Sequence, residues 1–536
     1  MPSILKTTLK MKATWFAVLM LHSTWGWSQS AAATDVPEPT LAIQRYVVDG
    51  DNPLSADETS ALLAPFLGEK RTMHDIESAS NALEGAMRAR GFLFHRMFIP
   101  EQKPVGGEIR LQVLGIKLGT VEVSGNEKFT NDNIRRSLTS LKEGEVPELQ
   151  MLGRDVSASN TNPAKHVTVT FKESAQPGLV DAVVKVQDSP TLVFFTTLTG
   201  NQSVSGHAPE QNTYRISGGV QHANLFDRDQ VATISYTTDP GNPSQVSLFA
   251  AYYQIPLYGT GMNVSASYIK SDINSGQVQQ GGGAFDVSGS GQFAGVRLTR
   301  ALNRVNALQQ TVGVGLDDRL FENSSTFASG AQANQQVQAE PKVGSRVLSL
   351  QYTFRNEPAW GDISGGLEYA ANIGGGSANT VTTHTANGGN KNWDAWRFNL
   401  EAALQAAQWQ YTGRIKGQYA SKALIQGEQF GLGGAGSVRG FADRVVSGDY
   451  GYQWNLEALG PAMETLQMRP VFFLEGGWVH ARSTGTSESL MSVGAGLRLT
   501  YQNMQAALDL AQVLDRNSAQ TSGRPMRLNL AVSYRF

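Results

Sequence analysis

From about residue 190 to the C-terminus, hydrophobic and polar residues alternate along segments of roughly ten residues. The last nine residues illustrate this, because Leu528, Leu530, Val532, Tyr534 and Phe536 share one face of an extended strand and the residues between them share the other. A tilted membrane-spanning β-strand has this length and period. The pattern predicts sixteen strands, which begin near residues 191, 213, 230, 244, 260, 290, 307, 345, 361, 393, 409, 448, 470, 489, 504 and 526.

The connections between these segments alternate in length. The long ones cover residues 272–289, 321–344, 373–392 and 422–447, whereas a turn such as Asn303–Asn306 is short. Outer-membrane barrels have long surface loops and short periplasmic turns, and a closed sheet of sixteen strands encloses a water-filled interior. Residues 190–536 are therefore predicted to form a transmembrane antiparallel β-barrel of 16 strands. A soluble β-sandwich is the alternative, but it gives no reason for this rhythm.

Before residue 190, helical and strand patterns follow one another. Helices are predicted to begin at the capping motifs Ser55–Glu58 and Thr72–Asp75, between strands over 41–48, 92–99 and 108–113. A second set begins at Thr120. It continues through 134–141, a helix over 146–158, and strands near 167–171 and 180–186. These patterns predict two small α/β domains of order β-α-α-β-β, over residues 39–115 and 116–189.

The N-terminus has the pattern of a secretory signal peptide. Lys6, Lys10 and Lys12 precede an apolar stretch over residues 13–21, and small residues follow from Ser28 onward. We expect residues 1–33 to be this signal, cleaved within 28–34. No other apolar run approaches the ~20 residues of a membrane helix, so we expect an exported protein without a helical anchor.

Composition argues against several other functions. The net charge of -2 gives no electrostatic reason to expect nucleic-acid binding, and the absence of Cys excludes disulfides and Cys-ligated metals. The eight His residues have no ligand-like spacing, so neither a metal nor another cofactor is expected. Gly431–Gly436 matches G-x-G-x-x-G, but it lies in a loop between membrane strands and not in a βαβ unit. No nucleophile motif is present, and we expect no enzymatic activity.

Several motifs resemble one known family. Gly433–Phe441, followed by Gly448–Tyr452 and Asn455–Glu457, is similar to the sixth surface loop and next strand of two-partner secretion transporters. These form the hemolysin secretion/activation branch of a superfamily that also contains barrel-assembly proteins. Upstream segments resemble the family's two POTRA domains: Leu62–Gly68, Arg90–Phe92, Ile99–Gln102 and Gly107–Val113 for the first, and Thr120–Gly125, Asn162–Pro163 and Pro177–Gly178 for the second.

The resemblance implies a transporter in the outer membrane of a Gram-negative cell. Its periplasmic POTRA domains would recognise a secreted partner exoprotein, and its barrel, surrounded by outer-membrane lipids, would conduct that protein outward. Insertion would depend on the barrel-assembly machinery, with Tyr534 and Phe536 as the C-terminal assembly signal. The alternatives are a factor that assembles other barrels, a diffusion porin, and an outer-membrane lipase. A porin gives no reason for the two periplasmic domains, and no Ser/His arrangement supports a lipase.

The family also suggests a specific ion pair. The motif Val438-Arg439-Gly440-Phe441 matches a loop whose arginine folds back into the lumen and meets an acidic residue in an F-x-D-x-G motif on the thirteenth strand. The matching stretch is Phe473–Gly477, where Glu475 stands in the place of the usual Asp. A period of two directs Glu475 to the lumen, and a guanidinium–carboxylate pair can be bidentate there. The resemblance therefore implies that Arg439 and Glu475 pair and gate the channel.

Many members of this family begin with a plug helix and a long linker. Only about eight residues, including Pro37 and Pro39, separate the expected cleavage site from Leu41. We therefore expect no helical plug, so that any resting closure depends on the loop that carries Arg439.

Overall fold

The computed structural model describes residues 39–204, 212–241, 243, 246–272, 276–280, 283–287, 290–305, 307–322, 342–463, 467–514 and 526–536. The signal peptide expected over residues 1–33 lies outside the described residues. In the described part of the chain, no helix is both long and apolar enough to cross a membrane.

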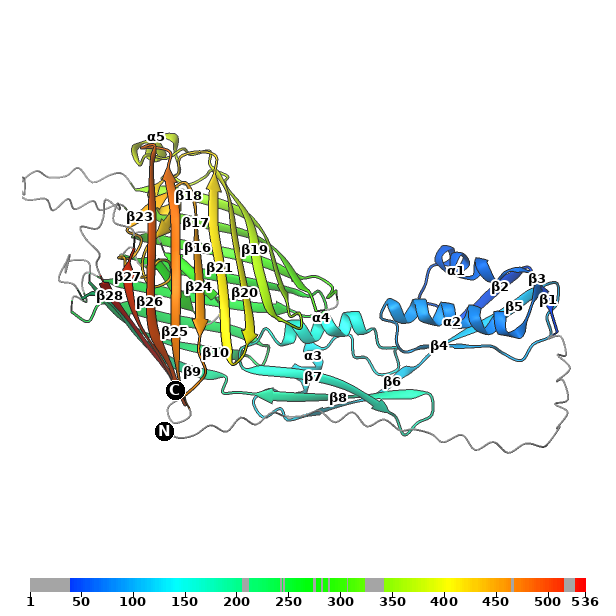
Figure 1. Cartoon of the computed structure of the whole chain (residues 1–536). Helices are drawn as coiled ribbons and strands as arrows, with labels where there is room; N and C mark the ends of the chain where they lie inside the picture. The colour runs from blue at the N-terminus through cyan, green and yellow to red at the C-terminus, as the bar shows by residue number, and fades with distance from the viewer. Residues whose placement is uncertain are drawn as a thin grey trace, which may run out of the picture.

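A closed barrel of 16 antiparallel strands forms the larger part of the molecule (Figure 1), as the alternating pattern predicted. Each strand begins within three residues of its predicted start. The first strand, β9, pairs with both β10 and the last strand, β28, so the sheet has no edge. The barrel strands are β9 (Leu192–Ser203), β10 (Thr213–Leu225), β11 (Gln230–Thr238), β12 (Ser247–Leu257), β13 (Met262–Ser271), β16 (Gly291–Ala301), β17 (Gln309–Phe321), β18 (Val343–Asn356), β19 (Gly361–Asn372), β20 (Asp394–Ala406), β21 (Trp409–Ala420), β24 (Tyr450–Leu459), β25 (Met468–Ala481), β26 (Thr486–Tyr501), β27 (Met504–Val513) and β28 (Met526–Arg535).

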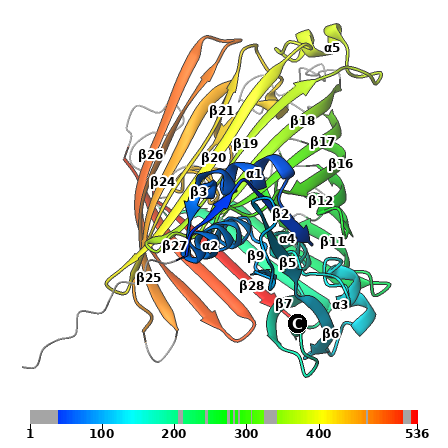
Figure 2. The ribbon, with the colours of Figure 1, turned by 90° about the vertical axis from the view of Figure 1, so that its right-hand side faces the viewer.

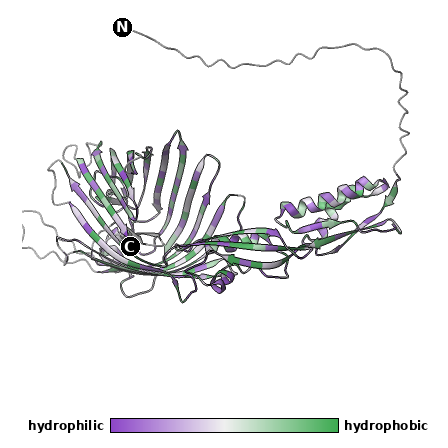
Figure 3. Ribbon diagram, turned by 90° about the horizontal axis from the view of Figure 1, so that it is seen from below, coloured by the Kyte–Doolittle hydropathy of each residue, from purple (hydrophilic) through white to green (hydrophobic). Residues whose placement is uncertain are grey.

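The two faces of the barrel wall differ in polarity. Trp396, Phe398 and Leu400 of β20 are exposed on the outer surface, whereas Arg397 and Asn399 between them line the interior. Hydrophilic and hydrophobic positions alternate along the strands in Figure 3. Each strand thus presents an apolar face outward and a polar face to the interior, the distribution that is typical of a transmembrane barrel.

The first α/β domain follows the predicted order with one addition. The predicted strand 41–48 is divided at Gln44, because the backbone N–H groups of Gln44 and Arg45 both donate to the carbonyl of Gly107. Its first part pairs with an unpredicted strand, β3, and its second part pairs in parallel with β5. The elements are β1 (Leu41–Ile43), β2 (Arg45–Gly50), α1 (Ala56–Leu63), η1 (Ala64–Phe66), β3 (Gly68–Arg71), α2 (Met73–Ala89), β4 (His95–Phe98) and β5 (Glu108–Gly115).

The second α/β domain contains a three-stranded sheet in the order β6-β8-β7 and two helices. Helix α3 begins earlier than the predicted segment 134–141, because the Thr130 hydroxyl accepts from the backbone N–H of Asn133 and caps it. Ile134 and Leu138 then pack with Leu152 against the sheet. The elements are β6 (Lys117–Ser124), α3 (Asn131–Ser137), α4 (Leu149–Ser159), β7 (Lys165–Glu173) and β8 (Leu179–Asp188).

This second domain is bound to two short turns of the barrel, at the end opposite α5 (Val381–Ala386; Figures 1 and 2). Lys165 at the start of β7 is fully buried, and its Nζ lies 2.6 Å from Oδ2 of Asp229 in the β10–β11 turn. The same Asp229 oxygen accepts from the hydroxyl of Tyr258, which follows β12. Asn133 accepts from the Lys165 ammonium at 3.0 Å. A buried charge pair therefore joins the domain to the barrel.

Burial dominates the electrostatics of this contact. It lowers the pKa of the Lys165 ammonium from its ordinary value, and the carboxylate of Asp229 opposes that shift. Neutral hydrogen bonds surround the pair. The Asn133 amide donates to the Asp227 carbonyl at 2.9 Å, and the Asn162 amide donates to the Ala223 carbonyl at 2.6 Å. The second domain is thus held in one orientation below the barrel opening.

Replacing Lys165 tests this contact. We expect Lys165→Met to leave the Asp229 carboxylate buried without its cation, at a cost of about 3 kcal/mol. The second domain should then separate from the barrel, and proteinase K should cleave the junction near residue 190 faster in isolated outer membranes. Lys172→Met is the matched control, because Lys172 is half-exposed on the same strand and pairs only at the surface. Equal cleavage rates for both variants would contradict this role of Lys165.

Candidate functional site in the barrel lumen

The connection between β21 and β24, residues 421–449, folds into the barrel. We call it loop 6. It contains η3 (Gln426–Glu428) and a small antiparallel pair, β22 (Phe430–Leu432) and β23 (Val446–Gly448). Val438 and Phe441 are buried against Val479 of β25, Leu490 of β26 and Val513 of β27. An apolar contact with the wall thus holds the loop inside the lumen.

Arg439 lies at the centre of this contact, with only 6% of its side chain exposed. Its Nη2 is 3.0 Å from Oε2 of Glu475, and its Nε lies 3.1 and 3.2 Å from the two oxygens of the same carboxylate. The backbone N–H of Arg439 also donates to Oε1 of Glu475. The structure therefore brings together the two residues whose pairing the family resemblance implied, with Glu475 on the lumen face of the thirteenth barrel strand.

Two further carboxylates surround the same guanidinium. Nη1 lies 3.0 Å from Asp509 of β27, and Nη2 lies 3.1 Å from Glu457 of β24. The sequence analysis assigned neither residue a partner. Arg498 of β26 bonds Asp509 at 2.6 Å, so the wall alone carries three carboxylates and one arginine. Charge-assisted hydrogen bonds to three strands make this a strong attachment.

The rest of the motif also fits closely. The Arg439 guanidinium lies 3.4 Å from the ring centroid of Phe473, a cation–π contact with the first residue of the F-x-E-x-G stretch. Gly440 has a φ of +96°, and a Cβ there would lie 3.3 Å from Val513 and 3.5 Å from Ser492. Only glycine adopts this backbone conformation easily, and any side chain would also press on the wall.

Two residues that follow Arg439 in the loop contact the first two barrel strands, β9 and β10. The carbonyl of Phe441 accepts from the amide of Asn201 in β9 at 3.2 Å. Asp443 lies 3.1 Å from Arg215 of β10. No sequence pattern predicts either contact, because the alternation of strand residues does not show which part of the wall a loop will meet.

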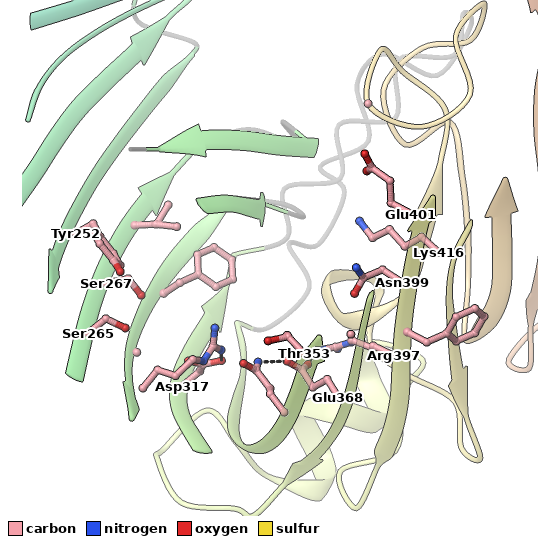
Figure 4. A pocket seen from close by; sticks show the side chains of 18 of the residues that line it. Tyr252, Ser265, Ser267, Asp317, Thr353, Glu368, Arg397, Asn399, Glu401 and Lys416 are labelled. Carbon is pink, nitrogen blue, oxygen red and sulfur yellow. Dashed lines mark hydrogen bonds and ion pairs between the residues drawn. The ribbon is translucent and has the colours of Figure 1, made fainter. Parts of the chain in front are cut away.

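Beside the loop lies a polar cavity of about 1540 Å³. Figure 4 shows part of its lining, which includes Tyr252, Ser265, Ser267, Thr353 and Asn399. Charged side chains such as Asp317, Glu368 and Arg397 line the same cavity. Among the described residues, no group of His, Asp or Glu is arranged to hold a metal ion.

The C-terminal aromatic residues lie on the outside of the barrel. Tyr534 and Phe536 are exposed and touch edge to face, with ring centroids 4.7 Å apart. The backbone N–H of Phe536 donates to the carbonyl of Phe194 in β9 at 2.8 Å. The two side chains belong to the surface that faces lipid, not to the lumen site.

Comparison with known families identifies the two parts of the chain. The model of the haemolysin secretion/activation protein ShlB/FhaC/HecB matches residues 182–499, and that of the ShlB-type POTRA domain matches residues 41–115. The chain is 23% identical to the outer membrane transporter CdiB of Dickeya dadantii, over 86% of this chain and 80% of CdiB. It is 20% identical to the heme/hemopexin transporter protein HuxB of Haemophilus influenzae, over 88% and 84%.

Solved structures show the same fold. CdiB from Escherichia coli superposes with a TM-score of 0.74 at 18% identity, covering 95% of this chain and 92% of that one. CdiB from Acinetobacter baumannii gives 0.71 at 16% identity, covering 93% and 90%. With a family model that matches more than half of its residues, this chain belongs to the haemolysin secretion/activation (ShlB/FhaC/HecB) family, whose members reside in the outer membrane with their POTRA domains in the periplasm and translocate a partner exoprotein.

Proposed function

We propose that loop 6 closes the translocation path. The contacts of Arg439 with Glu475, Glu457 and Asp509, which we call the Arg439 lock, hold the loop in the closed position. The observation that carries this proposal is the position of the buried Arg439 inside the lumen, on the path that an exoprotein would take. A chain moving outward must displace the loop. Because Arg439 can exchange its carboxylate partners for water, the lock can open without covalent chemistry.

We further propose that residues 39–115 and 116–189 act as two POTRA domains that receive the exoprotein in the periplasm. Each has a three-stranded sheet with edge strands, β2 and β4 in the first and β6 and β7 in the second. An edge strand can bind an extended segment through main-chain hydrogen bonds. The Lys165–Asp229 contact supports this role, because it keeps the second domain beside the barrel opening.

Three other roles belong to the same proposal. Residues 1–33 would direct export. Tyr534 and Phe536 would serve the barrel-assembly machinery as a C-terminal signal, and the outer aromatic and aliphatic side chains would contact outer-membrane lipids. Transport would proceed without enzymatic activity. An assembly factor for other barrels is the competing function, and a diffusion porin is a weaker one.

Deleting the gene separates these functions. We expect the deletion strain to lose one large secreted protein from its culture medium while its outer-membrane barrel profile stays unchanged, because a translocator serves its own exoprotein. Quantitative proteomics of medium and outer membranes measures both. A general decrease of outer-membrane barrels would instead support an assembly factor. An unchanged secretome together with reduced uptake of small solutes would support a porin.

Replacing Arg439 tests the lock. We expect Arg439→Ala to lower the amount of secreted exoprotein at least about tenfold. Without its charge-assisted hydrogen bonds the loop no longer keeps one position against the wall, so it conducts ions but obstructs the moving polypeptide. Insertion into the outer membrane should be unaffected, as measured by the heat-dependent electrophoretic mobility of the barrel. Arg414→Ala is the matched control, because Arg414 also lines the barrel wall but pairs with Glu401 on the neighbouring strand. Wild-type secretion by the Arg439 variant would leave Arg439 without a function in transport.

A further inference from the structure

Loop 6 has a second charged contact with the barrel wall. It lies at residues 426–428, which we call the root of the loop, whereas residues 438–443, which include Arg439, form its tip. Glu428, the last residue of η3, has no exposed side-chain surface. Its Oε2 lies 2.8 Å from Nη1 of Arg319 in β17 and 3.2 Å from Nη2 of Arg397 in β20. Neither strand takes part in the Arg439 contact, which uses β24, β25 and β27. The root of the loop therefore has its own attachment to a different part of the wall.

The two attachments also lie at different depths. Arg319 is two residues from the end of β17, and Arg397 is three residues from the start of β20, so both lie near the barrel rim that carries α5. Glu475 lies in the middle of β25. A contact at the rim can hold the root of the loop after a contact in the middle of the lumen has broken.

The barrel wall around Glu428 carries an excess of positive charge. Within the described part of the chain, Arg297, Arg319 and Arg397 form ion pairs with two wall carboxylates, Asp317 and Glu368, so three positive charges meet two negative ones. Figure 4 shows Asp317, Glu368 and Arg397 in the same part of the lumen. Glu428 of the loop supplies the missing negative charge. At the tip of the loop the charges are reversed. There the wall carries three carboxylates and one arginine, Arg498, and the loop supplies Arg439.

Backbone packing supports the same position. Gly427 lies against the ring of Phe321, and a Cβ on Gly427 would approach that ring to 2.2 Å. Ile425 packs with Phe321 and Val343, and the amide of Gln418 donates to the Glu428 carbonyl at 3.0 Å. Among the described residues, none donates a hydrogen bond to Oε1 of Glu428. The Glu428 side chain is therefore held through Oε2 alone, by its contacts with Arg319 and Arg397.

We propose that Glu428 is a positioning residue that anchors the root of loop 6 to Arg319 and Arg397, independently of the Arg439 lock at its tip. Opening then takes two separable steps, release of the tip and release of the root. This inference rests on the proposed role of loop 6 as the closure. Its test uses ion conductance, which needs no exoprotein, so it does not depend on identifying the secreted partner.

The experiment measures the fraction of time that the purified full-length protein spends in its large-conductance state in a planar lipid bilayer. We expect Glu428→Gln to raise the ratio of open to closed time at least about tenfold, since it removes a charge-assisted hydrogen bond from the closed state. Glu428→Asp keeps the charge and should stay close to wild type. Glu401→Gln, which removes a lumen carboxylate that pairs with Arg414 away from the loop, is the matched control.

The double variant Glu428→Gln/Arg439→Ala tests independence, and its increase should equal the product of the two single increases. If Glu428→Gln conducts like Glu401→Gln while Arg439→Ala opens the channel, the anchor is refuted and the lock stands. If neither Glu428→Gln nor Arg439→Ala changes conductance, closure by loop 6 itself is refuted. A double variant no more open than Arg439→Ala also overturns an independent anchor. Should Glu428→Gln fail to show the mobility of a folded barrel, Arg319→Gln removes the same contact from the wall and is expected to open the channel likewise.

Discussion

The structure depends on one constraint, which is that every backbone N–H and C=O group inside a membrane needs a partner within the protein. Sixteen strands meet it by closing β28 onto β9, which leaves no edge in the lipid. Closure has a second consequence. It creates a lumen in which side chains of loop 6 and of the wall are buried against one another, and charged groups buried in this way interact more strongly than on an open surface. The ion pairs of loop 6 belong to that enclosed space.

Loop 6 uses this environment with opposite charges at its two ends. Its root presents Glu428 to a wall with an excess of arginine, and its tip presents Arg439 to a wall with an excess of carboxylate. Exchanging the two ends would bring like charges together, so the arrangement also specifies how the loop lies across the lumen. When either contact breaks, the excess charge of the wall at that end of the loop loses its partner.

The periplasmic end of the barrel follows a different principle. Lys165, Asp229 and Tyr258 are buried together, so the second α/β domain is fixed relative to the turns between strands. The first domain ends with β5. It contacts the second domain through Gln150, whose amide donates to the Arg90 carbonyl at 2.9 Å, and through the rings of Phe94 and Phe171. The edge strands of the second domain therefore lie beside the periplasmic opening of the barrel. The first domain, attached to the second, extends this surface away from the opening.

The sequence by itself determined the barrel, because each strand carries its lipid face and its lumen face in consecutive residues. Strand number, approximate strand starts and the inward direction of Glu475 all followed from a period of two. The order of helices and strands within the two α/β domains followed from helix caps and hydrophobic periodicity. The division of the first strand at Gln44 did not. The pairing of Arg439 with Glu475 came from a family resemblance. Only the tertiary structure decided that Glu457 and Asp509 share Arg439, that Glu428 reaches Arg319 and Arg397, and that Lys165 meets Asp229. Each of these contacts joins residues that are distant in the sequence, and local patterns contain no information about which wall a loop will touch.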